Sequence, residues 1–193
     1  MNLEAAKREL RRQAGARRRA PAAADAVAAR VCEHLLAERA IIDARRVALY
    51  AALPDEVPTR PLFEALARAG TPRLLPRVAP GRRLVFALVE RWEDLRPGGY
   101  GVLEPPEAAP VFEPGEGDVV VVPGVAFDRA GRRLGRGKGY YDRAFPPGDR
   151  PRPWLFGVAC EAQIVESVPT DSHDRAMDAI VTERAFQWTE GGR

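Results

Sequence analysis

The sequence predicts an α/β protein, a three-layer fold in which helices flank both faces of a mostly parallel central sheet. Short apolar runs recur along the chain and are typical of strands buried on both faces. Helical segments alternate with these runs, which favours parallel strands joined by crossover helices. A chain of 193 residues is long enough to bury one core without disulfides or metals. We therefore expect a single domain over residues 1–193.

The first expected element is an amphipathic helix over residues 2–19. Its apolar side chains fall on one stripe at helical spacing, formed by Leu3, Ala6, Leu10 and Ala14. Lys7, Arg11 and Arg18 cluster within roughly 40° of one another beside that stripe. Long cationic side chains at the border of a buried face can reach into a cleft. This cluster can therefore extend into a cleft as well as into water.

A second helix and a series of strands follow. Helices are expected over residues 22–38 and 60–68. The expected strands are the short apolar runs at residues 47–51, 73–75, 84–89, 119–122, 155–159 and 179–182. The Pro- and Gly-rich residues 96–117 predict nothing longer than a strand at residues 100–103. We interpret this stretch as an insertion within the one domain.

Composition excludes several classes of protein. No apolar run approaches the roughly 20 residues that span a bilayer, so no membrane segment is expected. Cys32 and Cys160 lack a CxxC spacing and are too few for a disulfide scaffold. We interpret them as reduced and buried, in a cytoplasmic protein. His34 and His173 are too scattered to make a zinc site by themselves.

The net charge of +3 is unevenly distributed. Residues 1–30 carry eight basic and three acidic side chains, a pattern open to three interpretations: an organelle-targeting peptide, a nucleic-acid-binding arm or a solvated helix face. Unlike a targeting peptide, the segment contains acids and no serine. It also has no aromatic side chains to stack on bases. We therefore expect no nucleic-acid partner.

The chemistry is expected in the Gly-rich basic loop at residues 132–142. Open parallel sheets bind ligands at the carboxyl ends of their strands, and this loop follows the apolar run at residues 119–122. Glycines at every second position let backbone amides surround an anion, and they are Gly135, Gly137 and Gly139. The loop adds positive charge from Arg133, Arg136 and Lys138. A phosphate chain needs both features, whereas a flexible loop with solvated arginines is the alternative.

Two further features follow the glycines. Tyr140 and Tyr141 are expected to start a helix whose amino end favours anions. Asp142 offers a hard oxygen ligand suited to Mg²⁺. The spacing matches neither the P-loop nor the dinucleotide-binding GxGxxG pattern.

A longer pattern contains this loop. It comprises residues 121–128, Gly131 and residues 133–142. This run resembles the 5-formyltetrahydrofolate cyclo-ligases, also called 5,10-methenyltetrahydrofolate synthetases. Supporting matches lie in family order along nearly the whole chain: Lys7, Leu10-Arg11, Tyr50, Asp55-Glu56-Val57, Thr59, Leu75-Pro76-Arg77, Gly101, Glu104-Pro105, Gln163, Pro169, His173-Asp174, Asp178 and Thr182.

The resemblance implies an enzyme that uses ATP and Mg²⁺ to convert 5-formyltetrahydrofolate, with or without additional glutamates, to 5,10-methenyltetrahydrofolate. ATP phosphorylates the formyl oxygen, N10 of the folate closes the ring, and ADP and phosphate are released. The protein's part in such a reaction is largely positioning and charge neutralisation.

The resemblance also assigns site residues. Nucleotide contacts are Lys7, Arg11, Arg133, Leu134, Gly135, Arg136, Gly137, Lys138, Gly139, Tyr140 and Tyr141. Folate contacts are Ala51, Glu56, Arg136, Gly137, Lys138, Gly139 and Tyr140. The catalytic set is Arg136, Lys138 and Tyr140, and the Mg²⁺ ligands are Asp142 and Asp174.

Two roles and two other functions stay open at this point. Trp92 either walls the folate pocket or packs in the core, and His173 either takes part in the site or orients a turn. One rival function is an ATP-dependent enzyme that acts on another pterin, against which the acid Glu56 argues, since it can accept hydrogen bonds from the amino-pyrimidine. The other is a noncatalytic nucleotide- or RNA-binding module that uses the basic first helix.

Overall fold

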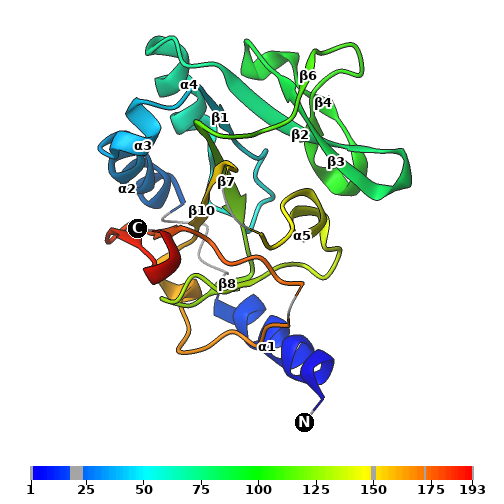
Figure 1. The fold of residues 1–193 in the computed structure, drawn as a ribbon, viewed down its shortest axis with the longest axis vertical. Coiled ribbons are helices and arrows are strands. Elements are labelled where there is room, and N and C mark those ends of the chain that lie inside the picture. The colour runs from blue at the N-terminus through cyan, green and yellow to red at the C-terminus, as the bar shows by residue number, and fades with distance from the viewer. Residues whose placement is uncertain (1, 18–23, 149–150, 172, 193) are drawn as a thin grey trace.

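The computed structural model describes residues 2–17, 24–148, 151–171 and 173–192, and its centre is an eight-stranded sheet (Figure 1). The strand order is β12-β11-β10-β7-β1-β2-β3-β6. The bounds are β1 Arg46–Ala48, β2 Arg73–Ala79, β3 Arg83–Leu88, β6 Val111–Phe112, β7 Asp118–Pro123, β10 Trp154–Val158, β11 Ala179–Val181 and β12 Phe186–Trp188. The five strands from β11 to β2 run parallel, and β12, β3 and β6 are antiparallel at the edges. The predicted fold class is confirmed.

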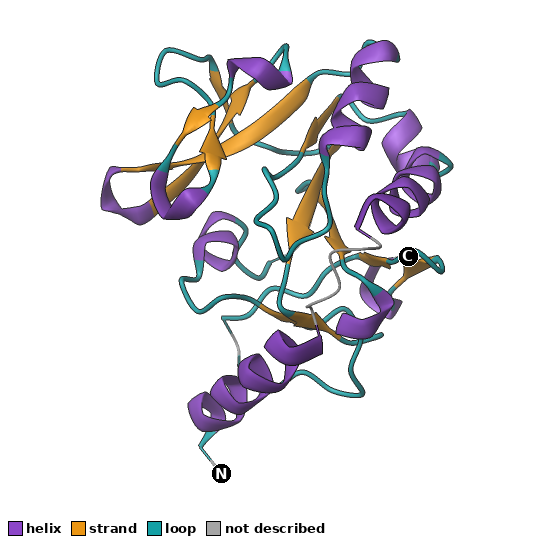
Figure 2. Cartoon of the chain, turned by 180° about the vertical axis from the view of Figure 1, so that it is seen from behind, coloured by secondary structure: helices purple, strands orange, loops and turns teal. Residues whose placement is uncertain are grey.

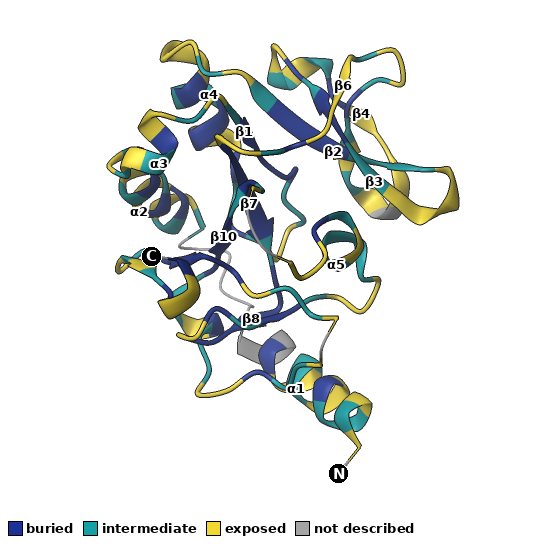
Figure 3. Cartoon of the chain, viewed as in Figure 1, coloured by how far each residue is buried: buried dark blue, intermediate teal, exposed yellow. Residues whose placement is uncertain are grey.

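Helices lie on both faces of this sheet (Figures 1 and 2). On one face are α2 (Ala24–Leu36), α3 (Arg39–Ile42) and α4 (Arg60–Arg68), and on the other is the short α5 (Tyr140–Ala144). The apolar residues of β7 pack on both faces of the sheet, because alternate side chains point in opposite directions. Val119 and Val121 pack with α2 and α4, whereas Val120 and Val122 pack with Phe145 after α5. Figure 3 shows these central strands as the most buried part of the chain.

The first helix, α1 (Leu3–Arg17), does not cover the sheet. Its stripe packs through Leu10 and Ala14 on a small cluster that includes Val125 and Leu134. These partners belong to or adjoin the two-stranded ribbon of β8 (Ala126–Phe127) and β9 (Arg133–Leu134). The helix is thereby joined to the start of the Gly-rich loop.

Several predicted boundaries were wrong. Residues 18–19 and 22–23 lie outside the described residues, so the end of the first expected helix and the start of the second stay predictions. β1 ends at Ala48 instead of residue 51, because the chain leaves the sheet to line a pocket. β2 is longer than expected and continues to Ala79, because it forms a hairpin with β3 around η2 (Pro80–Arg82).

The insertion at residues 96–117 also differs from expectation. The strand expected at residues 100–103 is replaced by a 3₁₀ turn, η4 (Gly99–Gly101), followed by β5 (Leu103–Glu104). Gly101 has a φ of +75°, a left-handed conformation that interrupts an extended run. β5 pairs with β4 (Arg96–Pro97), and the insertion returns as β6 at the edge of the main sheet.

The remaining short elements are η3 (Trp92–Asp94), η5 (Glu161–Gln163) and η6 (Glu190–Gly192). Neither thiol forms a disulfide, but each is half-buried instead of fully buried as expected. Cys32 packs beside the helices of the first face, and Cys160 packs against the same core cluster. Among the described residues, no helix has the length and apolar character needed to cross a bilayer.

Candidate functional site

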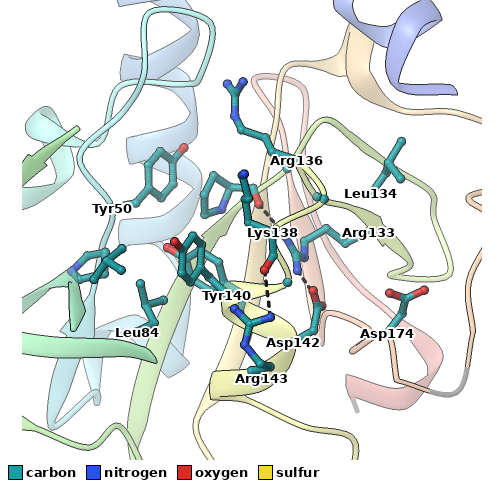
Figure 4. A pocket seen from close by; sticks show the side chains of 18 of the residues that line it. Tyr50, Leu84, Arg133, Leu134, Arg136, Lys138, Tyr140, Asp142, Arg143 and Asp174 are labelled. Carbon is teal, nitrogen blue, oxygen red and sulfur yellow. Dashed lines mark hydrogen bonds and ion pairs between the residues drawn. The ribbon is translucent and has the colours of Figure 1, made fainter. Parts of the chain in front are cut away.

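A pocket of about 1080 Å³ lies at the carboxyl edge of the parallel strands (Figure 4). Tyr50 and Ala51 line it where the chain leaves β1, and Pro123 and Gly124 line it at the end of β7. The pocket is at the edge where the sequence placed the chemistry. Every residue expected in the site lines it, and these are Lys7, Arg11, Ala51, Glu56, all ten positions from Arg133 to Asp142, and Asp174.

The Gly-rich loop forms the middle of the pocket wall. Gly137 and Gly139 have φ values of +87° and +64°, where a side chain would be strained. A Cβ on Gly135 would lie 2.9 Å from Nη1 of Arg133, so this glycine admits a close approach. Gly139 is the residue before α5, which begins at Tyr140 as predicted. Each of the three glycines therefore allows a backbone conformation or a close contact that the loop requires.

The first helix supplies two cations to one end of the pocket. Nζ of Lys7 lies 2.5 Å from Oδ2 of Asp174 and 3.1 Å from Oδ2 of Asp171. Nε of Arg11 donates to the carbonyl oxygen of Gly135 at 3.0 Å. Lys7 is only 6 % exposed, which confirms that it reaches inward. Arg18, the third cation of the expected cluster, is outside the described residues.

The protonation state of Lys7 follows from these contacts. Burial lowers the pKa of its ammonium group, but hydrogen bonds and charge attraction from Asp174 and Asp171 outweigh burial and raise it above 10.5. The same hydrogen bond helps to lower the pKa of Asp171, after the larger effect of the His173 backbone amide. This end of the pocket therefore holds one cation between two carboxylates.

At the opposite side of the loop, Arg136 is held by two acids. Its guanidinium is ion-paired with Asp55, and its Nε lies 3.1 Å from Oε1 of Glu56. The second oxygen of Glu56 accepts the backbone N–H of Leu53 at 3.0 Å. The loop is thereby tied across the pocket to the segment after β1. Asp55 was not among the residues expected in the site, although its position next to Glu56 pointed to it.

Arg133 and Asp142 form a second pair beneath the loop. Nη2 of Arg133 lies 2.7 Å from Oδ1 of Asp142, and Nη1 donates to the carbonyl oxygen of Pro123 at 3.3 Å. Its guanidinium carbon lies 5.6 Å from the centroid of the Tyr141 ring. Nε of Arg133 is buried without a hydrogen-bond partner among the described residues. This arginine therefore has donor capacity left at the pocket wall.

The tyrosines that follow the glycines are braced differently. Burial raises the pKa of Tyr141 far above 10.0, so its phenol is neutral near pH 7. Tyr140 lies under the guanidinium of Arg143, whose carbon is 5.5 Å from the ring centroid. Arg143 also donates to the carbonyl oxygens of Lys138 and Arg82, at 2.9 and 3.3 Å. Sequence reasoning missed Arg143, which joins the loop to the β2–β3 hairpin.

Figure 4 shows the pocket as two regions separated by the loop residues Lys138 and Tyr140. Tyr50 and Leu84 lie on one side, and Asp142 and Asp174 on the other. Among the described residues, no group of three His, Cys, Asp or Glu side chains is arranged to hold a metal ion. A site with one or two carboxylates still suits Mg²⁺, which commonly takes its other ligands from water and substrate phosphates.

The structure locates Trp92 and His173, the two residues whose roles the sequence left open. Trp92 packs in the core with its ring centroid 5.3 Å from that of Phe63, and it does not line the pocket. The idea that it walls a ligand pocket was therefore wrong. His173 lines the pocket, and its backbone N–H donates to Oδ1 of Asp171 at 2.8 Å, in a turn that presents Asp174.

Fold and site together define a class: an α/β protein with a Gly-rich, basic loop in a pocket at the carboxyl edge of its sheet. Residues 3–183 match the model of the 5-formyltetrahydrofolate cyclo-ligase family. The chain belongs to this family.

Individual relatives agree with the family match. The 5-formyltetrahydrofolate cyclo-ligase of Mycolicibacterium smegmatis is 33 % identical over 74 % of this chain and 76 % of its own. That of Escherichia coli K12 is 32 % identical over 77 % and 84 %. The 5,10-methenyltetrahydrofolate synthetase of Aquifex aeolicus superposes with a TM-score of 0.83 at 32 % identity, covering 97 % of this chain and 94 % of that one.

Proposed function

We propose that this protein converts 5-formyltetrahydrofolate to 5,10-methenyltetrahydrofolate with ATP and Mg²⁺, releasing ADP and phosphate. The observation that carries the proposal is the position of the Gly-rich loop between two chemically different regions of one pocket. One region is lined by cations and carboxylates suited to a nucleotide with its metal. The other contains Glu56, suited to a pterin. Family membership names the reaction that needs both.

The nucleotide is assigned to the region next to α1. Lys7 and Arg11 approach from the helix, and Arg133 approaches from β9 with an unpartnered buried Nε. Lys7 is already paired with two acids, so it serves best as a fixed charge whose orientation is set in advance. The amides of the loop supply further donors for phosphate oxygens.

Two carboxylates fit the expected Mg²⁺. Asp142 and Asp174 line the nucleotide region, and each is held by a cation, Arg133 and Lys7 respectively. Magnesium bound there together with phosphate oxygens would neutralise charge on the transferring phosphoryl group. The paired cations orient both carboxylates and keep the region close to electrically balanced.

The folate is assigned to the region that contains Ala51 and Glu56. Glu56 accepts hydrogen bonds through both oxygens, from Arg136 and from the Leu53 amide. A pterin that donates two hydrogen bonds to this carboxylate competes with Arg136 for Oε1. Folate binding therefore releases one of the contacts that hold Arg136, and Asp55 retains the other.

The loop stands where the two substrates meet. The formyl oxygen attacks the γ-phosphorus of ATP, the bond from that phosphorus to the bridging oxygen breaks, and ADP leaves. N10 then adds to the activated carbon and gives up its proton, and the carbon–oxygen bond breaks to release phosphate. Arg136 and Lys138 are assigned to the charge of the transferring group, and Tyr140 to the orientation of the folate. Their work is positioning and electrostatic stabilisation, as is general for phosphoryl transfer.

A coupled assay tests the proposal directly. Purified protein is mixed with 5-formyltetrahydrofolate and Mg·ATP, and methenyl product, ADP and phosphate are each measured. We expect the three to form in a ratio of 1:1:1, and no product without ATP or with excess chelator. Absence of methenyl product at micromolar enzyme would refute the proposal. ATP-dependent turnover of another reduced pterin alone would favour the rival pterin enzyme.

The contacts of α1 also bear on the RNA-binding alternative. Lys7 is buried against two acids, and Arg12 is paired with Glu9 at 2.6 Å. These side chains are therefore partly neutralised within the protein, which argues against a basic arm for nucleic acid. Cys32 and Cys160 form no disulfide, which suits a reducing compartment, and we place the enzyme in the cytoplasm.

A further inference from the structure

We propose that Arg77 binds the glutamate carboxylate of the folate and thereby extends the site along the β2–β3 hairpin. The inference rests on the proposed function, because it names the part of the same substrate that this region receives. Arg77 lies near the end of β2, opposite Val85 of β3, and it lines the pocket. None of the roles derived above uses it.

The position of Arg77 places it beyond the pterin region. Ala48 of β1 is in register with Leu74 of β2, and the two strands run parallel. Arg77 is three residues further along β2, or roughly 10 Å at about 3.3 Å per residue. β1 has ended before this level, so the hairpin projects past the core and forms a wall of the pocket. A substrate anchored near Glu56 can therefore extend along this wall.

Among the described residues, Arg77 has no carboxylate partner, unlike several other cations of the pocket. Lys7, Arg133 and Arg136 each contact at least one carboxylate. In the described part of the chain, no carboxylate lies within ion-pairing distance of Arg77. Its Nη2 donates to the carbonyl oxygen of Glu107 at 3.2 Å, and its Nε is buried without a hydrogen-bond partner. A buried donor without a partner is costly, and a bound anion would relieve that cost.

The nearby acid does not serve this purpose. Glu104 of β5 also lines the pocket, but its side chain lies over Gly98, where a Cβ would meet Glu104 Cδ at 2.5 Å. Arg143 is another pocket arginine on this side that is not ion-paired with a described carboxylate. Both of its terminal nitrogens already donate to backbone oxygens. Arg77 is thus the cation of this wall with donor capacity to spare.

The surrounding surface suits the middle of the same substrate. Val78 and Leu84 are partners across the hairpin and line the pocket, as does Val102 between the insertion's short elements. These apolar side chains suit the aminobenzoyl ring that joins the pterin to the glutamate. The pocket therefore offers an acid, apolar side chains and a cation, the three kinds of group that the pterin, the ring and the tail of a folate require.

Steady-state kinetics with two substrates test the inference. The substrates are 5-formyltetrahydrofolate and 5-formyltetrahydropteroate, which lacks the glutamate. With the unmodified enzyme, we expect loss of the tail to lower kcat/KM by about tenfold to a hundredfold, the effect of one charge-assisted hydrogen-bonded contact. Arg77→Met should show a similar loss with the complete substrate and little further loss with the tail-less one. Arg77→Lys should recover part of the activity.

Control measurements separate binding from structure. Arg83→Met removes an exposed arginine from the facing strand, outside the pocket lining, and should leave both substrates unaffected. Equal losses with both substrates in Arg77→Met, or a loss with neither, would overturn the inference, since a purely structural role predicts the former. Turnover of neither substrate by the unmodified enzyme would overturn the proposed function and the inference with it.

Discussion

The substitution Glu56→Gln separates folate binding from nucleotide binding most cleanly. It keeps the size and planarity of the side chain and removes its negative charge. The amide oxygen can still accept the backbone N–H of Leu53, which is 3.0 Å from the carboxylate oxygen. Arg136 loses one of its two acidic partners but keeps Asp55. We therefore expect a local change in recognition and little change in fold.

The magnitude follows from the hydrogen bonds that depend on the charge. A hydrogen bond to a charged group contributes about 1.5 to 3 kcal/mol. Since about 1.4 kcal/mol corresponds to a factor of ten, loss of one such contact with the pterin lowers kcat/KM by about tenfold to 150-fold. The substitution also weakens the contact of residue 56 with Arg136, which competes with the pterin for the same oxygen. The fall in kcat/KM should therefore not exceed this range.

The assay varies each substrate in turn. With ATP saturating, we expect the KM for 5-formyltetrahydrofolate to rise by this factor. With folate saturating, the KM for ATP should stay within about twofold, because Glu56 lies across the loop from the nucleotide region. The melting temperature checks that the protein remains folded.

A matched control is Asp55→Asn, which removes the other acid that holds Arg136. It leaves the carboxylate of Glu56 in place, so the KM for folate should stay the same or fall. An unchanged KM for folate in Glu56→Gln, or an equal rise in the KM for ATP, would refute the assignment of Glu56 to the pterin.

Other predictions concern the loop and its support. Lys138→Ala should lower kcat while changing the free energy of unfolding by less than about 0.5 kcal/mol, as urea titration would show, because the residue is exposed. Asp142→Asn should lower kcat by at least about a hundredfold and weaken the Mg²⁺ dependence, and full activity would exclude it as a ligand. Gly137→Ala, at φ +87°, should cost about 1 kcal/mol in urea unfolding, whereas Gly115→Ala, with open space and no positive φ, should not. The pKa of Tyr141 is raised in the folded state, so its contribution to stability is complete below about pH 10 and is lost as pH rises. Tyr141→Phe should therefore flatten the decline of unfolding free energy above that pH.

Local patterns in the sequence predicted much of this protein. The apolar run in β7 was recognisable because a strand buried on both faces needs apolar side chains at every position. The bounds of α4 were predicted to the residue, because Gly70 follows its last turn with a φ of +77°. The loop was recognisable from Gly137 and Gly139, whose backbone conformation few other residues adopt. Each of these signals depends on neighbours along the chain.

The lengths of the strands and the course of the insertion were harder to predict from the sequence. β2 continues to Ala79 because β3 pairs with it, and neither strand specifies that partnership alone. Trp92 was ambiguous for the same reason. An aromatic residue before a loop is equally compatible with a pocket wall and with the edge contact that it makes to Phe63.

The composition of the site was decided by tertiary structure. β7 lies between β1 and β10, which brings the segment after β1 beside the loop that follows β7. Arg136 can therefore reach Asp55 and Glu56, about eighty positions earlier in the chain. Lys7 meets Asp174 across 167 positions because α1 packs on the β8–β9 ribbon.

Sequence by itself determined the sheet's buried strands, the place of the Gly-rich loop and, through motif order, the family. Only the folded chain decided which acid pairs with which cation. It revealed Asp171, Arg77 and Arg143 at the pocket and Asp55 as an ion-pair partner of Arg136. The physical reason is that burial periodicity and backbone conformation are encoded locally. Charge pairing depends on distances of a few ångströms between segments that only strand order and packing bring together.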